Sequence, residues 1–159
     1  MKIVIADSST LITLLDTENF SFLFKLFDEM IITDEVYNEI TYKFNHKQKI
    51  DYYLCSKKLQ LQSIEHDELY EMLIKRLDAG ESESIALAKK LELPLIIDER
   101  KGRSMAKSIG VPIIGLVGII LQLLKSDIIL KEKAIEIIED IEANDFRLSQ
   151  GLKDLIYNY

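Results

Sequence analysis

The sequence contains no tryptophan, two prolines, six glycines and a single cysteine, Cys55. One cysteine cannot form an intramolecular disulfide, which favours a reducing compartment. The two histidines, His46 and His66, have no zinc-ligand spacing to Cys55 or to each other, and this argues against a Cys/His metal site. The scarcity of proline and glycine leaves no linker, and no repeat or low-complexity tract is present.

Long hydrophobic runs are also absent. The longest apolar stretch, "GLVGIILQLL" at 115–124, is about half of the roughly 20 residues that span a bilayer. No basic leader precedes the first apolar segment, which is too short for a signal peptide. We therefore expect a soluble, cytoplasmic protein without membrane association.

The chain has fewer basic than acidic residues. The formal net charge is −7 and the sequence pI is about 4.9, which argues against broad electrostatic attraction to nucleic acid. A nucleic-acid enzyme stays possible if acidic residues are concentrated in a metal-binding cleft. Two local basic clusters exist, at 43–49 and 99–107.

Short apolar runs alternate with helical patterns along the 159 residues. Strands are predicted at 2–6, 31–33, 93–98 and 111–115, with a strand or edge segment at 59–64. Helices are predicted at 10–15, 19–30, 34–44, 67–77, 81–92, 103–110, 116–125, 131–142 and 148–159. This alternation predicts an α/β fold with a mainly parallel sheet of four or five strands, in which 2–6 and 93–97 are central. We expect one domain, 1–159, with a core at about 1–118 and C-terminal helices, 119–159, that pack on it or form a partner surface.

Carboxylates follow two of the predicted strands. Asp7 ends "KIVIAD", and Asp98 and Glu99 end "LPLIIDE". In an open parallel sheet, ligands bind in the crevice beyond the carboxyl ends of the strands. Both strand ends are therefore predicted to face the same crevice.

Two helices add acidic residues to this crevice. Glu39 flanks the apolar stripe of its helix. Glu81 opens the helix after Gly80 and shares a face with Ile85 and Ala88, so it is predicted to point toward the sheet. Glu83 lies on a different side of that helix and is a weaker candidate.

Each acid also has a purely structural interpretation. Asp7 and Asp98 can cap the helices that follow them, and Glu39 alone fits a solvated helix face. Asp78 and Glu81 form a D-x-x-E capping box. The basic run after Asp98 fits an ordinary solvated surface.

Taken together, the acids favour a metal site. Clustered carboxylates raise one another's pKa unless a cation neutralises them, and oxygen ligands without His or Cys favour Mg²⁺ or Mn²⁺. Such ions activate water and stabilise the charge of a phosphodiester transition state. Arg100, Lys101 and Arg103 are placed to hold phosphate oxygens.

The order of several motifs resembles that of PIN-domain proteins, the fold of VapC-like toxin ribonucleases. The resemblance covers about 1–118 and is carried by "IADSS", "VYNEI", "GESESIALAKKLELPLIIDER", "AKSIGVPIIG" and "GIILQLL". It implies a three-layer α/β/α sandwich with an acidic, Mg²⁺-dependent site that hydrolyses RNA. It also implies a homodimer and a separate antitoxin protein as partners.

The resemblance assigns four acids by position: Asp7, Glu39, Glu81 and Asp98. It makes Ser8 the polar residue that supports the first acid. Glu81 stands where many relatives have Asp. Many relatives also carry Thr or Ser just before the fourth acid, where this chain has isoleucines, so the choice between Asp98 and Glu99 stays open.

Our hypothesis is a metal-dependent endoribonuclease, of the kind that serves as the toxin of a toxin–antitoxin pair. The alternative is a non-catalytic PIN-like binding module that acts through a protein partner. A response regulator is a third, weaker option, because "IADSS" offers one acid where that class has adjacent acids. The C-terminal "LSQGLKDLIYNY" presents an apolar stripe, Leu152, Leu155, Ile156 and Tyr159, which either closes the core or contacts a partner.

Overall fold

A sheet of five parallel strands runs through the middle of the computed structural model, which describes residues 1–159. The strands are β1 (Ile3–Ala6), β2 (Glu29–Ile32), β3 (Leu59–Leu61), β4 (Leu95–Ile96) and β5 (Ile113–Ile114). Their order is β3-β2-β1-β4-β5, and β1 pairs with β4 through Ile5 and Leu95. The predicted α/β class with a parallel sheet is confirmed, and β1 lies at its centre.

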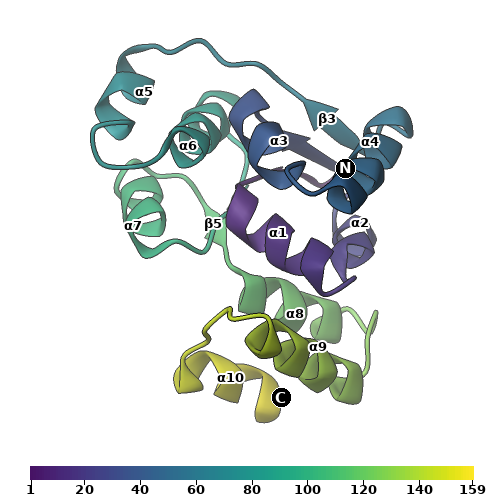
Figure 1. Cartoon of the computed structure of the whole chain (residues 1–159). Helices are drawn as coiled ribbons and strands as arrows, with labels where there is room; N and C mark the ends of the chain where they lie inside the picture. The colour runs from purple at the N-terminus through teal and green to yellow at the C-terminus, as the bar shows by residue number, and fades with distance from the viewer.

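The structure has ten α-helices (Figure 1). They are α1 (Ser8–Asp16), α2 (Leu23–Leu26), α3 (Asp34–Ile40), α4 (Phe44–Cys55), α5 (Glu68–Leu73), α6 (Ala79–Leu91), α7 (Arg100–Ser108), α8 (Leu116–Lys125), α9 (Lys131–Ala143) and α10 (Gln150–Tyr157). A 3₁₀ turn, η1 (Phe20–Phe22), precedes α2. Of the ten helices, α8, α9 and α10 form a group at the C-terminal end of the chain.

Both faces of the sheet are covered, which confirms the three-layer arrangement. Successive strand side chains point to opposite faces, and accordingly Val4 and Ala6 belong to one core cluster while Ile5 belongs to the other. The larger cluster contains buried residues of α1 to α4 and α8 to α10. The smaller cluster contains buried residues of α5, α6 and α7.

Helix α6 lies deepest in this arrangement. Every residue from Gly80 to Ala88 is buried, as expected for a helix that is covered on all sides. Its N-terminus therefore has a fixed position relative to β1 and α7, and the acids at that end have little freedom to move away from their neighbours.

Two predicted helices end earlier in the structure. The segment at 19–30 is divided, because Glu29 and Met30 pair with β1 and extend β2 instead. The helix at 34–44 ends at Ile40, and α4 follows as a separate helix that the sequence did not predict. Only two side chains of α4, those of His46 and Ile50, are buried, so its apolar periodicity is weak.

None of the helices combines the length and the apolarity that crossing a bilayer requires. The C-terminal helix α10 packs on α8 and α9, and its apolar stripe is divided between the core and the surface. Ile156 is fully buried, whereas Leu152, Leu155 and Tyr159 are 44%, 52% and 57% exposed. Only part of the stripe therefore closes the core.

This division predicts different costs for two substitutions on one helix. Ile156→Ala removes a fully buried side chain and should lower the free energy of unfolding by about 2–5 kcal/mol. Leu155→Ala, one residue away, should change it by no more than about 0.5 kcal/mol, since half of that side chain is already in solvent. Urea unfolding of the two variants measures both; equal losses would contradict the packing of α10.

Candidate active site

Several acidic residues lie near the point where the order of the strands reverses. The chain adds β2 and β3 on one side of β1 and then crosses to β4 on the other side. Open α/β sheets bind ligands at such a switch point, beyond the carboxyl ends of the strands. Asp7 directly follows β1, and Asp98 and Glu99 follow β4, so the predicted meeting of these strand ends is present in the structure.

Asp7 occupies the N-cap position of α1, but its side chain makes no capping hydrogen bond. The side chain is buried, 2% exposed, and its Oδ1 atom has no hydrogen-bond partner. The pKa of Asp7 is raised to about 7, chiefly by burial; a backbone hydrogen bond from Ser8 lowers it, and the nearby charges of Asp78, Glu39 and Glu99 raise it. The capping interpretation does not account for this residue.

Glu39 reaches the site from the C-terminal part of α3. The Ser8 hydroxyl donates a 2.5 Å hydrogen bond to its Oε2 atom. Ser8 therefore supports the second acid, Glu39, whereas the resemblance implies that it supports the first acid, Asp7. Gly80 leaves the space that Glu39 occupies, because a Cβ there would lie 2.2 Å from Oε1. Burial raises the pKa of Glu39, and the nearby charge of Asp78 also raises it.

Glu81 and Asp78 form the N-terminus of α6. The Asp78 carboxylate accepts the backbone N–H of Glu81 at 2.8 Å, which confirms the capping interpretation of Asp78. The Glu81 side chain is buried and extends toward Gly102 of α7, where a Cβ would lie 3.1 Å from its Oε2. Burial raises the pKa of Glu81 to about 8, and Asp78, Asp7 and Glu99 contribute.

Asp98 has a structural task in this arrangement. Its two oxygens accept the backbone N–H of Leu116 at 3.1 and 3.2 Å, and Oδ2 also accepts the Thr10 hydroxyl. It therefore holds the N-terminus of α8, where a negative charge is favourable. Of the two acids after β4, Glu99 is the one whose charge acts most on Asp7 and Glu81.

Glu83, the other weaker candidate, connects secondary-structure elements. One carboxylate oxygen accepts the backbone N–H of Glu35 at 3.2 Å, and the other lies 2.9 Å from Nε2 of His66. The His66 ring stacks on Tyr70 at 3.7 Å. Glu83, on α6, thus links that helix to α3 and to the segment before α5.

The predicted phosphate-binding residues do not behave alike. Arg103 is half-buried, and its Nη1 donates to the carbonyl oxygen of Ile97 at 2.9 Å. Arg100 and Lys101 are exposed and take part in no ion pair. Of the three cations, only these two are available to a ligand.

The candidate site thus consists of Asp7 and the acids near it whose charges act on one another, namely Glu39, Asp78, Glu81 and Glu99. All its donors are carboxylate oxygens, the ligands that Mg²⁺ and Mn²⁺ prefer, and one of them, Oδ1 of Asp7, is buried without a partner. This donor chemistry fits a hard divalent cation. As the side chains lie, no three His, Cys, Asp or Glu residues are grouped so that they could hold a metal ion.

Comparisons with known proteins support the same fold. A family model, DUF3368, described as a PIN domain, matches residues 3–158. The chain is also similar to the solved structure of a PilT N-terminus domain protein, SSO1118, from the hyperthermophilic archaeon Sulfolobus solfataricus P2. That likeness has 23% identity and a TM-score of 0.50, and it covers 78% of this chain and 94% of the other. No curated protein matches at a significant level.

The raised pKa values predict how the stability of the metal-free protein depends on pH. Unfolded Asp and Glu have pKa values of about 3.9 and 4.3, whereas Asp7 and Glu81 titrate at about 7 and about 8 in the folded protein. Between these values the folded state binds more protons, so the free energy of unfolding should fall as pH rises from 5 to 8. Each group contributes up to about 1.4 kcal/mol per pH unit.

Urea unfolding in a chelating buffer at pH 5, 6, 7 and 8 measures this dependence. Asp7→Asn cannot ionise and should reduce the slope, which isolates the contribution of Asp7 from those of other titrating groups. If the free energy of unfolding of Asp7→Asn falls with pH as steeply as that of the wild type, then Asp7 is already ionised in the folded protein over this pH range.

The two acids after β4 should respond differently to substitution. Asp98→Ala removes the acceptor of three hydrogen bonds at the start of α8 and should lower the free energy of unfolding by about 1–3 kcal/mol. Glu99→Ala should leave it unchanged or raise it, because an exposed charge that repels Asp7 is removed. The free energy of unfolding of both variants tests this prediction. A larger loss in Glu99→Ala than in Asp98→Ala would show that Glu99, and not Asp98, is the structural residue.

Proposed function

Since the chain belongs to the PIN-domain family, a family of nucleases, we propose that it is a metal-dependent endoribonuclease. The observation that carries the proposal is the Asp7 carboxyl, buried at the switch point with an unpartnered oxygen and surrounded by other acids. A buried charge without a counter-ion is costly. A divalent cation relieves that cost.

Asp7, Glu39, Glu81 and Glu99 are the residues that would hold Mg²⁺ or Mn²⁺, with Asp78 beside them. When bound, such an ion supplies activation of water and neutralisation of charge in the phosphodiester transition state. The Ser8 hydroxyl fixes the orientation of the Glu39 carboxylate.

The remaining protein groups position the site and the substrate. The N-cap bond of Asp78 holds the start of α6, which sets the position of Glu81. The exposed Arg100 and Lys101, directly after Glu99, hold phosphate oxygens of the RNA. Arg103 is excluded from that task by its bond to the Ile97 carbonyl.

Membership of a family whose members are often toxins supports a role as the toxin of a toxin–antitoxin pair. In that role the chain pairs with a second copy of itself and is inhibited by a separate antitoxin. The exposed Leu152, Leu155 and Tyr159 of the C-terminal segment are the apolar residues that such a partner covers.

The second candidate is a non-catalytic PIN domain that acts through a protein partner. The net charge of −7 and the separation of the carboxylates favour it. A response regulator is not supported, because the strand order β3-β2-β1-β4-β5 differs from the 2-1-3-4-5 order of that class.

The test is cleavage of single-stranded RNA by the purified chain. We expect cleavage with Mn²⁺ or Mg²⁺, none with a chelator, and a loss of at least about 100-fold in Asp7→Asn, which keeps the shape of the side chain but cannot carry its charge. The control, Asp140→Asn, changes an exposed acid on α9 and should leave the rate unchanged. Cleavage that survives both the chelator and Asp7→Asn would contradict the proposal.

A second readout does not depend on activity. Binding of Mn²⁺ should raise the stability of the wild type by about 2.7 kcal/mol at a hundredfold excess over Kd, seen as a higher thermal midpoint. Asp7→Asn should lose most of this increase, and Asp140→Asn should keep it. A metal-dependent shift without cleavage would favour the non-catalytic alternative.

A further inference from the structure

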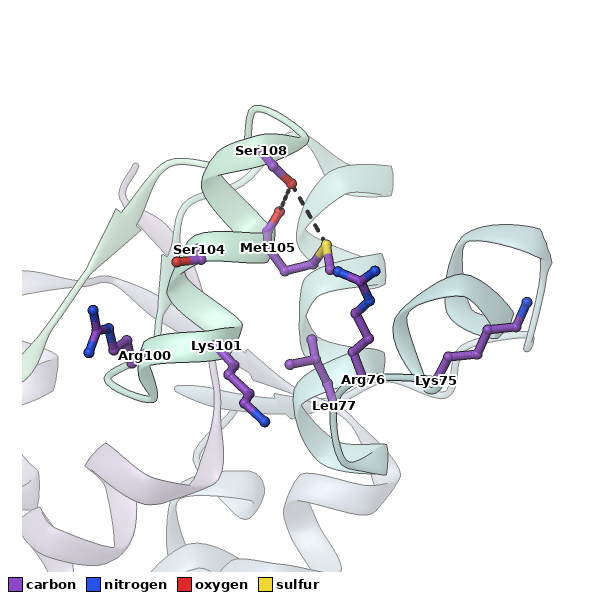
Figure 2. Close-up of a pocket in the computed structure, with 8 residues that line it drawn as sticks. All are labelled: Lys75, Arg76, Leu77, Arg100, Lys101, Ser104, Met105 and Ser108. Atoms are coloured by element: carbon purple, nitrogen blue, oxygen red, sulfur yellow. Dashed lines mark hydrogen bonds between the residues drawn. The ribbon is translucent and has the colours of Figure 1, made fainter.

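A basic pocket lies beside the acidic site. Its volume is about 920 Å³, and it is formed between α7 and the segment that precedes α6 (Figure 2). The lining residues are Lys75, Arg76, Leu77, Arg100, Lys101, Ser104, Met105 and Ser108. The sequence predicted a role for two of the four cations, whereas Lys75 and Arg76 are brought to them only by the fold.

The charge of this pocket is opposite to that of the whole chain. Half of its lining residues are cationic and none is acidic, although the chain has 27 acidic and 20 basic residues. None of the four cations forms an ion pair. Like charges gathered without counter-ions repel one another, so an anionic ligand is the species that stabilises them.

The arrangement of the side chains gives the pocket two cationic walls. Figure 2 shows Lys101 extending from α7 and Arg76 extending from the segment before α6, whereas the side chains of Arg100 and Lys75 point outward to opposite sides. Arg100 and Lys101 also lie in the first turn of α7, where the helix dipole attracts negative charge. Cations from two separate elements therefore line the pocket.

The pocket borders the acidic site through two covalent junctions. Leu77 directly precedes Asp78, and Arg100 directly follows Glu99. Consecutive Cα atoms are about 3.8 Å apart, so the backbone that lines the pocket lies next to the backbone that carries Asp78 and Glu99. The anion that suits both regions is a polymer, one part of which is held by cations while the next part lies over the carboxylates.

We propose that this pocket binds the sugar–phosphate backbone of single-stranded RNA next to the site of cleavage, an inference that rests on the proposed ribonuclease function. Cations bind phosphates without reading sequence. No aromatic side chain lines the pocket, so it lacks the stacking platform that holds bases in other single-strand sites. A volume of this size suits one or two nucleotides of one strand. The hydroxyls of Ser104 and Ser108 line the same pocket.

The test measures binding separately from cleavage. A fluorescent single-stranded RNA is titrated in a chelating buffer at several salt concentrations, with the wild type and with Arg76→Gln/Lys101→Gln. We expect at least tenfold weaker binding for the double variant. The slope of log affinity against log salt should become shallower by about 0.7 for each phosphate contact that is lost.

Lys107→Gln is the matched control, since Lys107 is exposed on the same helix but does not line the pocket. It should bind RNA as the wild type does, and thermal unfolding should show that both variants are folded. Equal binding by the double variant and the wild type would overturn the inference. So would an equal loss in the control, or tighter binding of an RNA duplex of the same sequence.

The outcome also separates this inference from the proposed function. If the wild type binds RNA through the pocket but does not cleave it with Mn²⁺, the nuclease proposal fails and the binding site stands. If the double variant binds and cleaves like the wild type, the pocket inference fails and the nuclease proposal stands.

Discussion

The parallel pairing of β1 with β4 is the constraint on which the rest of the site depends. It brings two strand ends together at the point where the sheet changes direction, and each end carries an acid. Asp7 is buried there with an unpartnered oxygen, and the charges that act most on it belong to other acids. A chain selected for stability alone has no reason to keep such a group, because replacing it with an apolar residue removes an unpaired buried carboxyl.

The elements around Asp7 hold this unfavourable arrangement in place. The buried helix α6 fixes the position of Glu81, and the Asp78 cap secures its first turn. Gly80 gives Glu39 room to approach, and Ser8 holds its carboxylate. The metal-free protein therefore carries electrostatic repulsion that it cannot relieve by moving a helix. A cation bound among these acids, as proposed, would relieve this repulsion.

Charge is divided between two adjacent regions. Acids gather beyond the ends of β1 and β4, while four unpaired cations line the pocket between α7 and the segment before α6. Because the net charge of −7 is the sum over both regions and the rest of the chain, it does not indicate whether this chain binds RNA. A cation bound among the acids also makes that region less repulsive to phosphate, so the two regions act in the same direction when metal is present.

The sequence by itself determined the fold class and the local features. Apolar runs separated by helical patterns predicted the parallel sheet, and the D-x-x-E spacing predicted the Asp78 cap, because these features depend on residues close together in the chain. Only the tertiary structure decided which side chains meet. Ser8 bonds to Glu39, 31 positions away, and Arg76 and Lys101 line the same pocket from different elements. Asp98 and Glu99 differ by one position, yet one caps α8 and the other faces the acids. The direction of a side chain just past the end of a strand is set by the helices packed around it, and local sequence does not encode that packing.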